Sequence, residues 1–227
     1  VSTHPLAGAA QQQLKTFDST IRADSSAALI FAVWADELTR GLIAPRLGPE
    51  RFAAMYGKRN FRATVEDVLM HNDAWWCAPL TCQAQADAAL TRALDRLQAL
   101  YGGDVTTWQW GRAHPAISMH RPFGNVALLA RFFDVSVPTG GDAYTINVGQ
   151  YWANEPIMPF ASRHAASLRA VYDLSNLENS EFIYQTGQSG LVFSKRYRDM
   201  SAAWANVQYR PLQLTPGEIR HTVVMTP

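Results

Sequence analysis

The chain has 227 residues, long enough to bury a substantial core as one large domain or two small ones. With 48% hydrophobic and 17% charged residues, it has the composition of an ordered globular protein. The net charge is +1 and the basic residues are scattered, which argues against a protein that binds nucleic acid or a membrane surface. Every apolar run is shorter than the roughly 18 residues of a membrane-spanning helix.

The first residue is Val1, and the residues after it lack the basic, apolar and small-residue regions of a signal peptide. Because there is no initiator Met, we expect the chain to have been cut from a longer product. Residues 1–24 are polar and rich in Gln and Ala, which predicts a lead-in helix or loop.

Helical periodicity dominates the first half of the chain. Ser25-Ser26 offers an N-cap to an apolar helix that should end near Gly41–Pro45. Gly48-Pro49 predicts a short helix with Pro in its first turn. A third helix is expected at about 63–70 and should end before Asn72-Asp73.

A fourth helix is predicted over about residues 83–101. Thr81 can cap its start, and Gly102-Gly103 should terminate it. Its core stripe consists of Leu90, Leu94, Leu97, Leu100 and Tyr101.

Glycines, prolines and short β-prone runs replace the long amphipathic periods beyond residue 105. The best strand candidates are Tyr144–Val148, Leu168–Leu174, Phe182–Thr186 and Ile219–Met225. Helices first and strands later, without β–α–β alternation, predict an α+β protein. We expect a mainly helical segment over residues 1–104 and a β-rich part over residues 105–227.

Cys77 and Cys82 are separated by four residues, and a turn at Pro79 could bring their sulfurs within bonding range. The two thiols make a poor zinc site, because no His lies at ligand spacing nearby. A disulfide, which would imply an oxidising compartment, is the preferred interpretation. The alternative is a pair of reduced thiols in a cytosolic protein.

Ser189 is the most tempting nucleophile, because it lies in Gly187-Gln188-Ser189-Gly190. Ser189 does not fit a G-x-S-x-G nucleophile elbow, since position 191 is Leu. We therefore interpret Ser189 as a structural serine in a turn. The glycines on either side of it, Gly187 and Gly190, predict a tight bend that other residues could not easily follow.

Histidines and glycine-rich turns offer the other candidate sites. His114 and His120 are six residues apart, which fits neither one helical face nor a zinc site, so hydrogen bonds to backbone carbonyls are the preferred interpretation. Pro138-Thr139-Gly140-Gly141-Asp142 could suggest a phosphate or metal loop, but the helix and lysine of a phosphate loop are missing. We expect a turn in which Asp142 accepts hydrogen bonds from nearby backbone amides.

Several motifs, taken together and in order, resemble the end of the large (beta) subunit in the penicillin acylase family. The resemblance covers about residues 20–212 and is strongest from Thr186 to Leu212. Its structural positions are Gly140, Gly141, Asp142, Arg169, Gly187, Ser189, Gly190, Tyr197, Asp199 and Trp204. The Trp76-Cys77 to Cys82 segment resembles an element of the periplasmic acyl-homoserine-lactone acylase branch, in which the cysteines are expected to pair.

The resemblance implies an N-terminal-nucleophile hydrolase made as a precursor that cuts itself. Its nucleophile would be a Ser at the start of the beta chain, outside this sequence, with its own α-amino group as the base. No catalytic residue is carried over to this chain. The implied fold is the C-terminal part of an αββα sandwich with an attached helical segment. No cofactor is expected in this chain, and a structural calcium elsewhere in the full enzyme is compatible with the family.

The sequence thus predicts the C-terminal portion of the beta subunit of an autoprocessed, periplasmic or secreted acylase. It would hydrolyse a linear amide, either an acyl-homoserine lactone or a penicillin-type N-acyl substrate. We expect its partners to be the alpha subunit and the N-terminal part of the beta subunit, because a core cut here would leave sheet edges and apolar faces open. The alternative is a non-catalytic scaffold or interaction domain that reuses this part of the fold.

Overall fold

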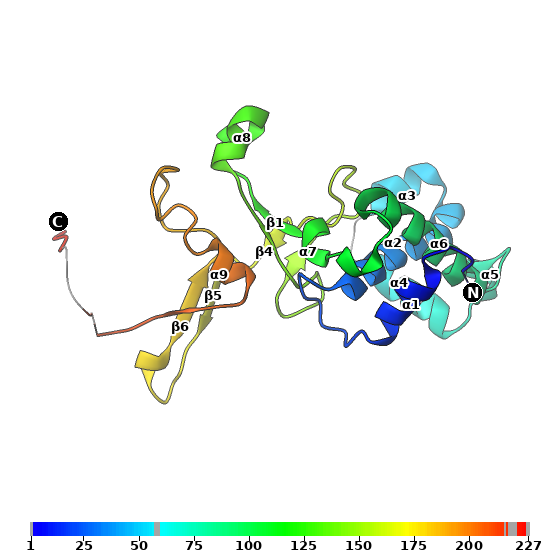
Figure 1. Cartoon of the computed structure of the whole chain (residues 1–227), viewed down its shortest axis with the longest axis horizontal. Helices are drawn as coiled ribbons and strands as arrows, with labels where there is room; N and C mark the ends of the chain where they lie inside the picture. Colours follow the sequence, from blue (N-terminus) through cyan, green and yellow to red (C-terminus); the bar gives the residue numbers. More distant parts are fainter. Residues whose placement is uncertain (1, 57–59, 216, 218–221, 226–227) are drawn as a thin grey trace. The chain divides into compact units, whose positions relative to one another are not determined.

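The computed structural model describes residues 2–56, 60–215, 217 and 222–225 of the chain (Figure 1). Two compact units are distinguished within it. Unit 1 consists of Val1–Ser118 and Ser136–Ala165, and unit 2 consists of Met119–Val135 and Ala166–Pro227. Helices predominate in unit 1 and a small antiparallel sheet lies in unit 2, so the predicted α+β class is confirmed.

Two long helices, α2 (Ser26–Leu47) and α6 (Cys82–Tyr101), form the centre of unit 1 and lie side by side (Figure 1). The Ser25 hydroxyl accepts a hydrogen bond from the Ala28 backbone amide at 3.1 Å, so it caps the first turn of α2. Thr81 caps α6 in the same way. Both predicted caps are therefore confirmed.

The two helices pack together because their facing sides bury apolar side chains. Its fully buried side chains include Leu29, Ile30, Val33, Leu94, Leu97 and Trp108. Each such side chain contributes on the order of 2 kcal/mol to folding by leaving water. The remaining helices of unit 1 are α1 (Ala7–Lys15), α3 (Pro49–Met55), α4 (Asn60–Met70), α5 (Ala74–Cys77), the 3₁₀ turn η1 (Val105–Thr107) and α7 (Trp110–Ala113).

Cys77 at the end of α5 and Cys82 at the start of α6 form a disulfide. Cys77 and Cys82 are bonded, their Cα atoms are 5.0 Å apart, and both side chains are buried. They belong to a second apolar cluster that also contains Phe52, Val68 and Ala89. The bond confirms the preferred interpretation of the cysteine spacing and ties α5 to α6.

Short strands complete unit 1. Strand β1 (Pro115–Ser118) pairs with β2 (Val135–Pro138), and β3 (Gly149–Gln150) pairs antiparallel with β4 (His164–Ala165).

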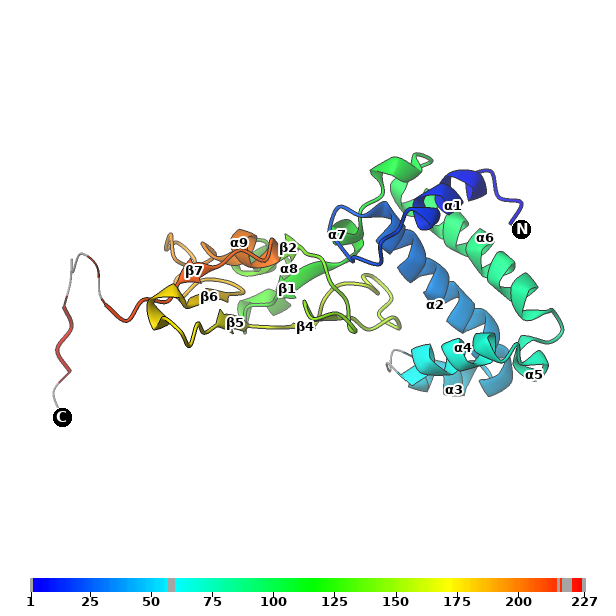
Figure 2. The same ribbon diagram turned by 90° about the horizontal axis from the view of Figure 1, so that it is seen from below.

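Unit 2 is organised around a three-stranded sheet in the order β5-β6-β7 (Figure 2). Its strands are β5 (Leu168–Val171), β6 (Glu181–Tyr184) and β7 (Arg210–Pro211), and both pairings are antiparallel. The unit also contains η2 (Phe123–Asn125), α8 (Ala127–Phe133), η3 (Leu177–Asn179) and α9 (Ser201–Ala205).

Several predicted boundaries were wrong. Helix α2 continues through Pro45 to Leu47, because a proline two residues before the end removes little of the hydrogen-bond ladder, and Gly48 then turns the chain with φ 79°. The predicted strand at Tyr144–Val148 is a series of turns and bends, because the hydroxyl of Thr145 and the carboxylate of Asp142 bond the local backbone instead.

The remaining strand predictions vary in outcome. The strand from Leu168 ends at Val171 rather than at Leu174, because Asp173 accepts bonds from the amides of Ser175 and Asn176 in a turn. Within the predicted strand Ile219–Met225, residues 219–221 lie outside the described residues, and 222–225 carry no strand. The division into residues 1–104 and 105–227 stays a prediction.

Candidate functional site

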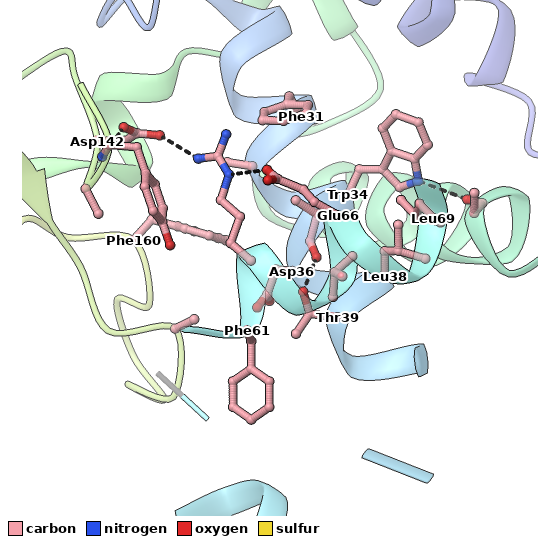
Figure 3. A pocket seen from close by; sticks show the side chains of 18 of the residues that line it. Phe31, Trp34, Asp36, Leu38, Thr39, Phe61, Glu66, Leu69, Asp142 and Phe160 are labelled. Carbon is pink, nitrogen blue, oxygen red and sulfur yellow. Dashed lines mark hydrogen bonds and ion pairs between the residues drawn. The ribbon is translucent and has the colours of Figure 1, made fainter. Parts of the chain in front are cut away.

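A cavity of about 560 Å³ lies within unit 1 (Figure 3). It is lined by α2, by α4, by the start of α6 and by the segment from Asp142 to Phe160. Such a volume falls in the range of about 300–1,000 Å³ that is typical of small-molecule sites. This cavity is therefore the candidate site of the described residues.

The wall of the cavity is predominantly apolar. Its large side chains include Phe31, Leu38, Phe61, Val65, Leu69 and Phe160. Small side chains on α2 leave space for the cavity. Ala28, Ala32 and Ala35 recur at spacings of four and three, so they share one helix face. An apolar chain or ring of a ligand would therefore be removed from water when it enters the cavity, which favours binding.

Arg62 on α4 lies in this wall between two carboxylates. Its Nε donates to Glu66 Oε1 at 3.1 Å, and its Nη1 is 3.6 Å from Asp142 Oδ2, as the dashed lines in Figure 3 mark. The guanidinium carbon lies 4.3 Å from the ring centre of Tyr144. This network connects helix α4 to the loop that begins at Asp142.

The deepest charge in the wall is Asp36 on α2, whose side chain is 3% exposed. Its Oδ2 accepts hydrogen bonds from Arg96 at 2.7 Å and from Arg40 at 3.3 Å. Its Oδ1 is buried and has no hydrogen-bond partner among the described residues. Burial raises the pKa of this carboxyl group, while the two arginines oppose the rise.

Tyr56 places a second unsatisfied polar atom in the same wall. Its hydroxyl is buried and has no hydrogen-bond partner in the described part of the chain. The guanidinium carbon of Arg40, which also bonds Asp36, lies 4.3 Å from the Tyr56 ring centre. A buried acceptor and a buried hydroxyl therefore flank one arginine.

The glycine-rich loop that ends at Asp142 was predicted from the sequence, and the structure gives a role to three of its residues. Gly141 has φ 83°, and a Cβ there would overlap the carbonyl oxygen of Asn147. A Cβ on Gly140 would lie 2.6 Å from the Ile21 carbonyl oxygen. Asp142 accepts a hydrogen bond from the Tyr144 amide at 2.7 Å, which confirms the predicted turn.

His114 is fully buried near this loop. Its Nδ1 lies 2.5 Å from the Phe160 carbonyl oxygen, and its ring stacks on Trp110 with ring centres 4.6 Å apart. Burial lowers the pKa of His114 to about 4, although the bond to Phe160 and the charge of Asp142 oppose this. The imidazole is therefore neutral at pH 7. Its contact with a backbone carbonyl is the one that the sequence predicted.

The second predicted histidine behaves differently. The His120 ring stacks on Phe123, and its Nδ1 is buried without a hydrogen-bond partner in the described chain. It is the His120 backbone amide, not its ring, that bonds a side chain, the Asp134 carboxylate, at 2.9 Å. The expected ring-to-carbonyl bond is thus absent for this residue within the described part.

The motif residues of unit 2 form a packed network. The Arg169 guanidinium donates to the Trp204 carbonyl oxygen at 2.7 Å and lies 4.4 Å from the Trp204 ring centre. The Trp204 indole in turn donates to the Ala166 carbonyl at 2.8 Å. Tyr197 donates from its hydroxyl to the Phe133 carbonyl. These contacts hold the sheet, α8 and α9 of this unit together.

Asp199 in the same network accepts bonds from two arginines. Its Oδ2 lies 3.0 Å from Arg196 and 3.2 Å from Arg210. The hydrogen bond from Arg196 is the largest of the contacts that lower the pKa of Asp199.

Ser189 has the contacts of a turn residue. Its hydroxyl accepts a bond from the Leu191 amide at 3.1 Å, and its own amide donates to the Arg196 carbonyl. A Cβ on Gly187 would overlap that same carbonyl oxygen. The prediction was wrong for Gly190, which has no positive φ and open space where a Cβ would stand.

The sequence predictions located only part of the cavity. Of the predicted motif residues, Asp142 lines it, whereas Asp36, Tyr56 and Arg62 were missed. A signal in the sequence was the position of Asp36, directly after the apolar run of residues 27–35 in α2. Among the described residues there is no group of three or more His, Cys, Asp or Glu side chains that could hold a metal ion. No described helix is both long and apolar enough to cross a bilayer.

The sequence profile of the family described as Penicillin amidase matches residues 2–221. This chain belongs to the penicillin amidase family. The resemblance predicted from the ordered motifs is thereby confirmed.

Several curated relatives of this chain are named acylases. Acyl-homoserine lactone acylase QuiP of Pseudomonas fluorescens is 28% identical over an alignment of 234 positions that covers 95% of this chain and 28% of that protein. QuiP of Pseudomonas syringae pv. syringae is 27% identical over 88% of this chain and 25% of its own length. Penicillin acylase 2 proenzyme of a Pseudomonas species is 28% identical over 89% and 26%. The chain thus spans about a quarter of the length of these relatives.

A solved structure is also similar. Thermostable penicillin G acylase from Alcaligenes faecalis matches with a TM-score of 0.47 and 16% identity, over 100% of this chain and 44% of that one.

Proposed function

We propose that this chain is the C-terminal portion of the beta subunit of an autoprocessed acylase that hydrolyses a linear amide bond. The observation that carries the proposal is the family match over residues 2–221, together with relatives named acylases. The nucleophile would be an N-terminal Ser outside this chain. The chain itself would supply part of the αββα sandwich and the attached helical segment.

The contacts of the described side chains support a structural rather than a catalytic role for this chain. Ser189 is bonded into a turn, and His114 is bonded to a carbonyl and held neutral by burial. Neither arrangement joins a nucleophile to a base at hydrogen-bond distance. The acid, base and nucleophile would therefore come from elsewhere in the enzyme.

The surface of unit 2 supports a chain that is covered by the rest of the enzyme. Large apolar side chains stand exposed on it, namely Leu128, Phe132, Val171, Tyr172, Leu174, Leu191 and Phe193. Exposed apolar areas often mark surfaces that contact another part of a protein. We propose that the alpha subunit and the N-terminal part of the beta subunit cover them.

The substrate and the location follow from the relatives and from the disulfide. More of the curated relatives are named acyl-homoserine lactone acylases than penicillin acylases, so we propose an N-acyl homoserine lactone as substrate. The Cys77–Cys82 bond favours a periplasmic or secreted enzyme, because such bonds persist in oxidising compartments.

The test is intact-mass spectrometry and N-terminal sequencing of the native protein, followed by hydrolysis assays with N-acyl homoserine lactones and with penicillin G. We expect a co-purifying chain that begins with Ser, and release of homoserine lactone that is lost when this Ser is replaced by Ala. A native preparation that contains only the 227-residue chain and releases neither product would support the non-catalytic scaffold instead.

A further inference from the structure

Strand β5 forms one edge of the sheet in unit 2, whose described strands have the order β5-β6-β7 (Figure 2). Hydrogen bonds in an antiparallel pair recur at every second residue of a strand. Just before β5, the Ser167 carbonyl oxygen accepts a hydrogen bond from the Gln185 amide at 3.0 Å. By this alternation, Arg169 and Val171 are the residues of β5 whose backbone groups bond β6.

The amides and carbonyls of Leu168 and Ala170 face away from β6. Within the described part of the chain, no residue forms a hydrogen bond with these outward groups. The outward carbonyl that precedes them, on Ala166, accepts a bond from the Trp204 indole at 2.8 Å, so the open stretch begins at Leu168. A row of unpaired backbone groups on an edge strand is a template for pairing with a further strand.

The opposite edge of the sheet is blocked. The Leu212 amide donates to the Ser180 carbonyl at 2.7 Å, so the same alternation turns the backbone of Pro211 outward from β7. Proline has no N–H to offer a further strand, and natural sheets use it to protect their edges. Strand β5 contains no proline, and its one charged side chain, Arg169, is bonded to the Trp204 carbonyl.

The side chains of β5 indicate what kind of strand fits beside it. Successive side chains of a strand point to opposite faces of the sheet, so Leu168 and Val171 lie on different faces. Leu168 is 46% exposed and Val171 is 56% exposed. A neighbouring strand covers both side chains only if it carries apolar residues on both of its faces. Such a strand reads in sequence as a short continuous apolar run.

The length of the edge indicates where this strand comes from. Strand β5 has four residues, whereas a stable interface between separate proteins involves about 20–30 residues on each side. The partner strand must therefore belong to a polypeptide that this chain also binds elsewhere. This chain spans about a quarter of the length of its curated relatives, so the remainder of the enzyme is such a polypeptide.

We propose that the outer edge of β5 pairs with a strand from the remainder of the enzyme. This strand is apolar on both faces, and its backbone bonds the amides and carbonyls of Leu168 and Ala170. The inference rests on the proposed function, and it names the edge at which the sheet of the complete enzyme continues.

The experiment is hydrogen–deuterium exchange of the complete enzyme, resolved to single amides by fragmentation in the mass spectrometer. We expect the outward amides of Leu168 and Ala170 to exchange within about tenfold of the rates of Arg169 and Val171, because both pairs are hydrogen-bonded. The amides of Arg169 and Val171, which bond β6, are the internal control. Outward amides that exchange more than about tenfold faster than these would overturn the inference.

Two variants test whether this protection requires backbone pairing. Ala170→Pro removes an outward N–H and leaves the bonds from β5 to β6 in place, so exchange at Leu168 should become more than about tenfold faster while Arg169 and Val171 stay slow. The matched control, Pro211→Ala, restores an amide at the other edge and should leave exchange at Leu168 unchanged. Unchanged exchange at Leu168 in Ala170→Pro would contradict the pairing. If this variant unfolds the sheet, all these amides exchange fast and the natural enzyme decides.

Photo-crosslinking identifies the partner strand. The substitution Tyr172→p-benzoylphenylalanine places the crosslinker on an exposed aromatic residue directly after β5. In the complete enzyme we expect a crosslink to a short apolar run outside the 227 residues of this chain. A crosslink to a second copy of this chain, or to another segment of the chain itself, would overturn the inference.

The inference and the proposed function can fail separately, because hydrolysis of N-acyl homoserine lactones is assayed independently. An active enzyme in which the Leu168 and Ala170 amides exchange fast would overturn the inference and leave the acylase activity standing. An inactive preparation with protected amides and the expected crosslink would support the strand pairing and overturn the proposed activity.

Discussion

At the scale of single residues, Gly187 and Gly190 make a matched pair in one loop of unit 2. The backbone of Arg196 passes so close to Gly187 that a Cβ would overlap its carbonyl oxygen, whereas nothing lies within 4 Å of a Cβ on Gly190. The two glycines therefore differ in the room available for a Cβ atom, and not in their backbone φ angle.

We expect Gly187→Ala to lower the free energy of unfolding by about 2 kcal/mol, because the backbone must shift to admit a methyl group. Gly190→Ala should change it by less than about 1 kcal/mol and could raise it, because alanine restricts the unfolded chain. Urea unfolding of both variants measures the difference. Equal destabilisation by the two substitutions would contradict the steric explanation.

The buried imidazole of His114 makes a prediction about pH. Its pKa is about 4 in the folded chain and about 6.5 in the unfolded chain. Between these values the unfolded state binds a proton that the folded state excludes, so stability falls as pH drops from about 6.5 to about 4. The contribution of this one group to the loss is about 3 kcal/mol.

The midpoint can be measured directly by NMR, from the ring C–H shift of His114 as a function of pH. The signal is assigned from its disappearance in His114→Gln. The expected midpoint is near pH 4; a midpoint near that of a free imidazole would mean that water reaches the ring. His71→Gln, at an exposed position, is the control for removing a surface histidine.

At the scale of elements, the stability of α2 depends on the cap of its first turn. The Ser25 hydroxyl satisfies the Ala28 amide, one of the backbone groups that a helix start leaves without a partner. Its other end tolerates Pro45 because only the last turn is affected and Gly48 follows with positive φ.

Ser25→Ala should therefore lower the free energy of unfolding by about 1 kcal/mol. Ser25→Asp should retain most of the stability, since a carboxylate oxygen can accept the same bond and is favoured at a helix N-terminus. Thermal and urea unfolding of the two variants give the comparison. If aspartate destabilised the protein as much as alanine does, the cap would not be the cause.

At the scale of the whole molecule, the exposed apolar side chains of unit 2 mark a surface that we propose other parts of the enzyme cover. Phe193 is 90% exposed and Leu174 is 87% exposed. Large apolar side chains exposed to this extent often mark a surface that contacts another part of a protein.

Hydroxyl-radical footprinting should show this difference. In the complete enzyme we expect the oxidation rates of Phe193 and Leu174 to fall several-fold relative to the isolated chain, because burial blocks radical access. Trp204, which is 1% exposed, should be protected in both preparations and serves as the internal reference. Unchanged oxidation of Phe193 and Leu174 would show that nothing covers this surface.

The sequence by itself determined the features that depend on neighbouring residues. The caps at Ser25 and Thr81, the disulfide between Cys77 and Cys82, and the turn at Asp142 are local, because their partners lie within a few positions of one another. The family was also readable, because its motifs occur in order along the chain.

Only the tertiary structure decided the candidate site. Arg62 and Asp142 are far apart in sequence, and so are Asp36 and Arg96, yet each pair forms an ion pair beside the cavity. Which polar atoms remain unsatisfied depends on every neighbour around them, and periodicity cannot supply that information. For the same reason the sequence could not distinguish Gly187 from Gly190: the atom that makes Gly187 necessary belongs to Arg196, which folding brings across the loop.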